Sequence, residues 1–155
     1  MNRALLAGVL GAALVAVAAK PVSASSAEQA QALVERAADY VREHGRQQAL
    51  AAFSRPDGGF VNGELYIFCI DVTGIQVANG GNPKLVGKNL FGVRSADGKL
   101  PTLEIYRLGQ ANGQGWFEYR WPNPKAQSIQ RKVSYFLRID DETVCGSGYF
   151  MPDQP

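Results

Sequence analysis

The most informative stretch of this sequence is Gly115-Trp116-Phe117-Glu118-Tyr119-Arg120-Trp121-Pro122-Asn123-Pro124. It concentrates aromatic rings and one arginine between turn-forming residues, and successive side chains of a strand point to opposite faces. One face of the predicted strand therefore carries Trp116, Glu118 and Arg120, and the other carries Phe117, Tyr119 and Trp121. The wall of a small-ligand pocket has this mixture of apolar and polar groups. An aromatic-rich antiparallel strand with one solvated face has it as well.

The N-terminus is typical of a cleavable secretory signal peptide over residues 1–24. Arg3 gives it a positive start, residues 4–19 are apolar or glycine, and Val22-Ser23-Ala24 has the small residues that signal peptidase prefers. An uncleaved anchor is the alternative, although a membrane span needs about 20 apolar residues. The 155-residue chain is long enough for one domain and too short for two. We expect a single domain over residues 25–155, exported to the periplasm or secreted.

Removal of the predicted signal peptide leaves a formal net charge of zero. The full chain has 16 Lys and Arg against 14 Asp and Glu, and Arg3 and Lys20 are the charges lost. A neutral domain gives no reason to expect nucleic acid, whose binders carry a clear basic excess. His44, the single histidine, lies at the end of a predicted helix, where the helix dipole favours a cation. Without a nucleophile–base pair or a cluster spaced for a metal, we expect neither an enzyme nor a metal or cofactor site.

The order of predicted elements is two helices, two strands, a long crossover that contains a helix, and three strands. The first helix begins at Ser25, which has Glu28 three residues on in a capping-box spacing, and Gly45 ends it. The other elements are a helix at 46–53, strands at 65–71 and 75–78, a helix at 102–112, and strands at 116–121, 128–140 and 143–150. This is an α+β order, with a sheet covered on one face by helices. The crossover exceeds the roughly 12 to 15 residues usual for a structureless loop, which indicates a ligand lid or binding loop.

Cys69 and Cys145 are the two cysteines of the chain. In an exported protein they form a disulfide if the fold brings their α-carbons within about 7 Å of each other. The alternative is a pair of buried thiols that pack as small apolar side chains.

Several segments, taken in order, resemble a single Cache domain, the extracytoplasmic relative of the PAS fold that serves bacterial chemoreceptors and histidine kinases as a sensing module. The resemblance covers nearly all of residues 25–150. The segments are His44-Gly45-Arg46, residues 49–53 (ALAAF), residues 65–68 (LYIF), residues 82–90 (NPKLVGKNL), the aromatic stretch quoted above, residues 132–135 (KVSY) and Gly146-Ser147-Gly148.

The resemblance implies a five-stranded antiparallel sheet behind a long N-terminal helix. It also implies a small organic ligand, commonly a short carboxylate or an amino acid, held between the sheet and the long loop. In the family's sheet the first and last strands are neighbours, which would place Cys69 beside Cys145. The sequence departs from the family at Asn79-Gly80, where many relatives have His-Pro. A neutral amide replaces an ionisable imidazole there, so the ligand's identity does not carry over.

The candidate ligand-binding residues are aromatic, amide and cationic side chains on the predicted strands and at the start of the crossover. They are Tyr66, Phe68, Asn79, Trp116, Tyr119, Arg120, Trp121, Lys132 and Tyr135. Arg120 and Lys132 are the cations that would hold a carboxylate, and an arginine can bind one through two parallel hydrogen bonds. Alternation does not decide which face lines the pocket. If Arg120 faces outward, then Tyr119 and Trp121 line the site and Lys132 carries the charge alone.

The sequence is therefore interpreted as an exported sensory domain. Because the last predicted strand is followed by five residues, we expect a separate membrane receptor, kinase or transporter to carry the signal. Homodimerisation through the N-terminal helix is left open. The alternative function is a structural or interaction domain whose pocket is filled by its own side chains.

Overall fold

The computed structural model describes residues 26–151, and the predicted signal peptide, residues 1–24, lies outside this range. The elements are α1 Ala27–His44, α2 Arg46–Phe53, β1 Val61–Asn62, β2 Leu65–Tyr66, β3 Phe68–Asp71, β4 Gln76–Asn79, the 3-10 helix η1 Pro83–Leu85, α3 Pro101–Asn112, β5 Gln114–Asn123, β6 Ser128–Arg138 and β7 Thr143–Met151. Among the helices of residues 26–151, none combines the length and apolar character that a membrane span requires.

Helix α1 begins one residue later than the sequence pattern suggested. The Ser26 hydroxyl accepts a hydrogen bond from the Gln29 backbone N–H, and the Gln29 side chain accepts one from the Ser26 N–H. The predicted Ser25–Glu28 capping box is therefore wrong, because the next serine and a glutamine at the same spacing provide the same two bonds. The predicted end is confirmed: Gly45 follows His44 and has a φ of 81°, which favours glycine.

The main sheet is antiparallel, with its five strands in the order β4-β3-β7-β6-β5. This confirms the expected α+β architecture. Strands β3 and β7 are neighbours, and their register sets Cys69 opposite Cys145. The two cysteines form a disulfide, with their Cα atoms 4.0 Å apart. The pairing that the family resemblance implied is confirmed.

The strand predicted at residues 65–71 is divided in two. Strand β2 pairs with the short strand β1, with Val61 opposite Tyr66, and β3 pairs with β4 and β7. Ile67 lies between the two pieces, and its carbonyl accepts a hydrogen bond from the Gly80 N–H. The chain thus leaves one sheet and enters another at Ile67, a change that the continuous apolar run did not reveal.

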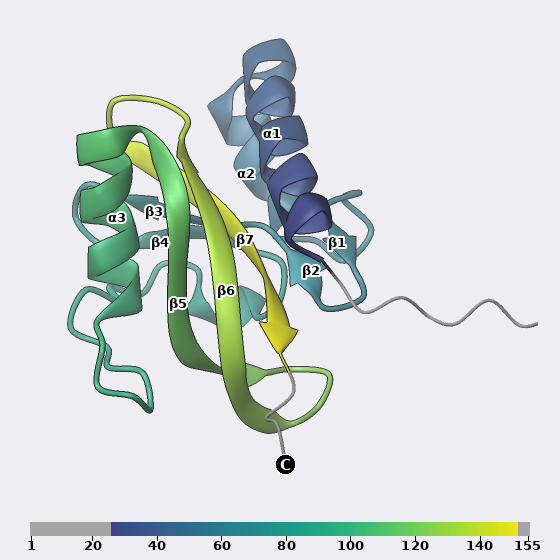
Figure 1. Cartoon of the computed structure of the whole chain (residues 1–155). Helices are drawn as coiled ribbons and strands as arrows, with labels where there is room; N and C mark the ends of the chain where they lie inside the picture. The colour runs from purple at the N-terminus through teal and green to yellow at the C-terminus, as the bar shows by residue number, and fades with distance from the viewer. Residues whose placement is uncertain (1–25, 152–155) are drawn as a thin grey trace, which may run out of the picture.

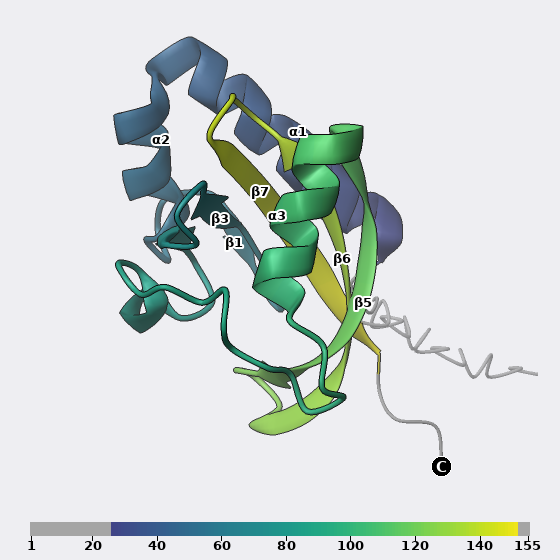
Figure 2. The same ribbon diagram turned by 90° about the vertical axis from the view of Figure 1, so that its left-hand side faces the viewer.

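Helices cover both faces of the main sheet, so the prediction of a single covered face is wrong (Figures 1 and 2). Consecutive residues of β6 show the two layers. Tyr135 belongs to the apolar cluster under α1 and α2, whereas Phe136 belongs to the cluster that contains Ile105 and Tyr106 of α3. The crossover returns over the opposite face because the apolar side of α3 must be buried against the sheet. It is on this α3 side that the candidate site lies.

Candidate functional site

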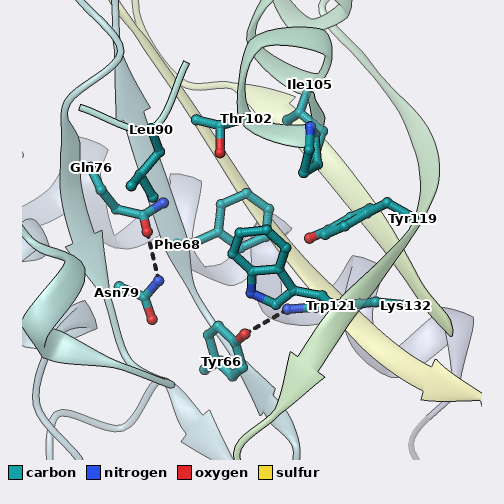
Figure 3. Close-up of a pocket in the computed structure, with 11 residues that line it drawn as sticks. Tyr66, Phe68, Gln76, Asn79, Leu90, Thr102, Ile105, Tyr119, Trp121 and Lys132 are labelled. Carbon is teal, nitrogen blue, oxygen red and sulfur yellow. Dashed lines mark hydrogen bonds between the residues drawn. The ribbon is translucent and has the colours of Figure 1, made fainter. Parts of the chain in front are cut away.

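A small cavity lies on the α3 side of the sheet, between β4, α3 and the β5–β6 hairpin (Figure 3). The residues that line it come from the strands, from the crossover and from the first turns of α3. They are Tyr66, Phe68, Gln76, Asn79, Leu90, Pro101, Thr102, Ile105, Tyr119, Trp121 and Lys132. The volume open to the centre of a water molecule is about 20 Å³. That is room for roughly one water, so the surrounding side chains leave little free space.

Lys132 is the only cation among the residues that line this cavity, and it is 1% exposed. Its Nζ donates a hydrogen bond of 2.8 Å to the Tyr66 hydroxyl and lies 4.0 Å from the centre of the Tyr66 ring. The ring of Phe150 lies 5.0 Å away. Within residues 26–151, no carboxylate is close enough to form an ion pair with it. Burial without a counter-charge lowers the pKa of Lys132 to about 7.

Glycines of β7 make room for the stem of Lys132. A Cβ atom at Gly148 would lie 2.9 Å from Lys132 Cε and 2.3 Å from the Ser134 Oγ. A Cβ atom at Gly146 would lie 2.6 Å from the Phe68 ring. Side chains at these two positions would occupy the space that the lysine and the ring now fill, so the Lys132 stem and the Phe68 ring pack directly on the backbone of β7.

An amide pair forms the wall opposite Lys132 (Figure 3). The Asn79 Oδ1 accepts hydrogen bonds from the backbone N–H groups of Gly81 and Asn82, at 3.0 and 2.7 Å. Its Nδ2 therefore faces the Gln76 Oε1 and donates to it at 2.8 Å. The oxygen of the Asn79 amide therefore fixes the backbone at the start of the crossover, and its nitrogen fixes Gln76. The NH2 group of Gln76 makes no hydrogen bond within the described part of the chain, and it remains available to a ligand.

Two buried phenols and a threonine add neutral hydroxyls to the site. Burial raises the pKa of Tyr66 and that of Tyr119, so both phenols stay protonated. The Tyr119 hydroxyl is 3.2 Å from the Ser134 Oγ, and Figure 3 shows the hydroxyls of Tyr119 and Thr102 directed into the cavity. The site therefore combines one buried cation, neutral hydrogen-bonding groups and apolar walls.

Six of the nine residues proposed from the sequence line the cavity. They are Tyr66, Phe68, Asn79, Tyr119, Trp121 and Lys132. The other three do not line it. The rings of Trp116 and Tyr135 lie 5.1 Å apart, and Tyr135 packs in the cluster under α1. The guanidinium of Arg120 donates to the Ile129 carbonyl. The observed arrangement is the alternative in which Tyr119 and Trp121 face the site.

Five lining residues were not named from the sequence, and four of them lie on the crossover or on its helix. They are Gln76, Leu90, Pro101, Thr102 and Ile105. The length of the crossover indicated a binding loop, but without periodicity before residue 101 it did not indicate which side chains turn inward. Within residues 26–151 no group of three or more His, Cys, Asp or Glu side chains could hold a metal ion.

An α+β fold with a small polar-lined cavity on one face of a five-stranded antiparallel sheet is the architecture of PAS-like domains. The particular family follows from comparison with known proteins. The model of the family described as Single Cache domain 2 matches residues 10–153. The chain belongs to this family.

Relatives of the chain are chemotaxis receptors and their sensor domains. The methyl-accepting chemotaxis protein McpP of Pseudomonas putida is 28% identical over 126 residues, which cover 77% of this chain and 22% of that protein. The chain thus spans less than a quarter of the length of this curated relative.

Solved structures show the same fold. The periplasmic sensor domain of a chemotaxis protein is 30% identical, with a TM-score of 0.61 over 80% of this chain and 89% of that one. A Cache chemosensory domain, solved to explain its recognition of carboxylic acids, is 25% identical, with a TM-score of 0.69 over 80% and 92%. A methyl-accepting chemotaxis protein from Vibrio parahaemolyticus RIMD 2210633 has a TM-score of 0.71 over 81% and 88% at 18% identity, and shows the fold alone. The comparisons support a sensory ligand-binding domain.

Proposed function

We propose that this domain senses a short carboxylic acid, which it binds in the cavity with its carboxylate against Lys132. The observation that carries the proposal is the state of that lysine. Its ammonium group is buried and has one phenol hydroxyl as its hydrogen-bond partner. A buried charge without a counter-ion is costly, and a carboxylate ligand would supply the missing charge.

The rest of the cavity suits a small acid. Leu90, Ile105 and Trp121 offer an apolar wall to a short hydrocarbon chain. At the other end, the NH2 group of Gln76 and the hydroxyl of Thr102 can bond to a second polar group, such as a hydroxyl or oxo oxygen. The order of these groups corresponds to a carboxylate, a short hydrocarbon chain and a second polar group, and the cavity of about 20 Å³ has to widen to admit them.

The relatives support the same ligand class. The Cache domain that is 25% identical to this chain recognises carboxylic acids, and other relatives are periplasmic sensor domains of chemoreceptors. We therefore also propose an exported, periplasmic location for this domain. A separate signalling partner and homodimerisation through α1 remain predictions.

Calorimetric titration with acetate, propionate, lactate and pyruvate tests the proposal. The wild-type protein should bind at least one of these acids and gain thermal stability from it. Lys132→Met should weaken binding about tenfold or more, because a charge-assisted hydrogen bond is lost. Methionine fills a similar volume and removes a buried charge, so this variant should fold well.

Lys84→Met is the matched control, because Lys84 is an exposed cation of the crossover that does not line the cavity. It should bind the acid as the wild type does. If Lys132→Met binds as tightly as the control, then Lys132 is not the carboxylate site. If purified wild-type protein binds none of a broad set of organic acids and amino acids, the cavity is filled by its own side chains and the domain is structural.

A further inference from the structure

A second chamber lies beside the cavity, and Tyr66 is the one residue that lines both. The outer chamber has a volume of about 310 Å³ open to the centre of a water molecule, against about 20 Å³ in the inner cavity. Its wall is formed by the β1–β2 hairpin, the start of the crossover and the β5–β6 turn. The residues are Val61, Gly63, Glu64, Tyr66, Gly80, Gly81, Asn123, Pro124 and Lys125. Gly63, Pro124 and Lys125 are exposed, so this chamber opens to solvent.

Tyr66 is buried, and its ring meets backbone rather than a side chain at Gly81. Its hydroxyl makes one hydrogen bond, to Lys132. Its ring lies against Gly81, where a Cβ atom would be only 2.4 Å from the ring. Gly80 and Gly81 thus put no side chain between the ring and the outer chamber, whose nearest side chain on the paired strand is that of Val61. A rotation of the ring toward that chamber meets no side chain at these two positions.

The inner cavity is too small for the acid that it is proposed to bind, so one of its walls has to move. We propose that Tyr66 is the gate between the two chambers and that ligand reaches Lys132 through the outer chamber. This inference rests on the proposed function, because the incoming carboxylate takes over the Lys132 hydrogen bond that now holds Tyr66 closed. The outer chamber is then a binding subsite that the acid occupies before the gate opens. Its wall carries one charge of each sign, on Lys125 and on Glu64.

The kinetic test uses Trp121 as a reporter. The chain has two tryptophans, so Trp116→Phe leaves Trp121, which lines the inner cavity, as the sole indole. Both native cysteines are in the disulfide, so Lys125→Cys adds a single thiol at the outer chamber that a bulky maleimide can label. Arg42→Cys, which removes an exposed cation of α1, is the matched control.

Stopped-flow mixing with propionate should show association about tenfold slower after labelling at position 125, and unchanged after labelling at position 42. Tyr66→Phe removes the hydrogen bond to Lys132 but keeps the ring, and should speed both association and dissociation. Equal association rates for the labelled and unlabelled Lys125→Cys proteins would overturn the proposed route.

A ligand-free measurement separates this inference from the proposed function. Tyr66→Ala removes the shared wall, so acrylamide should quench Trp121 about twofold more strongly than in the protein with Tyr66. Labelling at position 125 should cancel that increase. If quenching follows this pattern but no acid binds, then the connection through Tyr66 stands and the proposed function fails. If quenching is insensitive to the label, then the outer chamber does not lead to the cavity.

Discussion

A single buried lysine determines what the site can bind. The ammonium of Lys132 is surrounded by aromatic rings and a phenol hydroxyl, and the described residues provide no carboxylate to it. Burial therefore acts on its pKa without opposition. Two measurable pH effects follow, one on stability and one on binding.

The ligand-free protein should become more stable as the pH rises above 7. Lys132 has a pKa of about 7 in the folded protein, whereas the ordinary value for a lysine is 10.5. Between these two pH values, the lysine is protonated in the unfolded chain and neutral in the folded protein. The free energy of unfolding should therefore rise by about 1 kcal/mol per pH unit from pH 7 to 9. Urea unfolding of wild type and Lys132→Met at pH 6, 7, 8 and 9 checks this. Parallel pH profiles for the two proteins would show that Lys132 keeps an ordinary pKa.

Carboxylate affinity should fall over the same range. A carboxylate pairs with the protonated lysine, which is the main form below about pH 7 in the ligand-free protein. Above that value, binding has to take up a proton, so the dissociation constant should rise by up to about tenfold per pH unit. Calorimetry in buffers of different ionisation enthalpy would also detect the proton uptake. An affinity that is constant from pH 6 to 9 would contradict the ion pair.

At the residue scale, the sequence predicted which side chains share a face but not where each face points. Alternation correctly grouped Tyr119 with Trp121 and separated them from Trp116 and Arg120. Which face lines the site depends on where α3 packs against the sheet. The local sequence pattern does not contain that information. Likewise, Asn79 was found as a lining residue, but its bonds to the crossover backbone could be seen only in the structure.

Among the elements, β7 supports the site from beneath, because Gly146 and Gly148 leave room for the Phe68 ring and the Lys132 stem. Gly148→Ala would place a methyl group 2.3 Å from the Ser134 Oγ and 2.7 Å from the Val133 carbonyl oxygen. We expect it to lower the free energy of unfolding by about 1 to 3 kcal/mol, as overpacking does, and to weaken carboxylate binding by displacing Lys132. Denaturant unfolding and calorimetry measure the two effects.

The control for this change is Gly92→Ala, at a glycine of the crossover whose added Cβ would meet no atom within 4 Å. This variant should keep both the stability and the affinity of the wild type. A Gly148→Ala protein that matches Gly92→Ala in both measurements would show that β7 and its neighbours accommodate the added methyl group without displacing Lys132.

Most element positions were predictable, because hydrophobic periodicity and glycine stops are local signals. The helices at 46–53 and 102–112 and the last three strands agree with α2, α3, β5, β6 and β7 within a few residues. The exchange of sheets at Ile67 was not predictable, since a continuous apolar run is compatible with one strand or with two. Strand β1 is two residues long and carries no pattern of its own.

The disulfide should contribute strongly to the stability of the whole molecule. It joins residues 76 positions apart, and closing a loop of that length stabilises the fold by about 4 kcal/mol in the chain-entropy description. The Cys69→Ala/Cys145→Ala double variant should therefore lose most of that amount in urea unfolding. Adding a reductant should lower the stability of the wild type and leave the double variant unchanged. Equal unfolding free energies for the double variant and the wild type without reductant would contradict this expectation.

For the molecule as a whole, the family resemblance predicted more of the tertiary structure than hydrophobic periodicity did. It implied five antiparallel strands with the first and last as neighbours, and therefore the adjacent cysteines, which depend on contacts between distant parts of the chain. The placement of α3 on the opposite face from α1 was missed, because helix and strand order alone does not assign a connection to one face or the other. The crossover was foreseen as the binding loop over the sheet, but its lining residues Leu90, Pro101, Thr102 and Ile105 were not, because they depend on how α3 packs.

The covalent link between β3 and β7 lies in the middle of the five-strand order, with β4 on one flank and β6 and β5 on the other. The cavity takes walls from both flanks, the amides of Gln76 and Asn79 on one and Lys132 with its aromatic neighbours on the other. We expect a bound molecule that moves these walls apart to displace the disulfide-linked pair β3–β7 least and the edge strands β4 and β5 most, because the covalent bond fixes the separation of the two central strands.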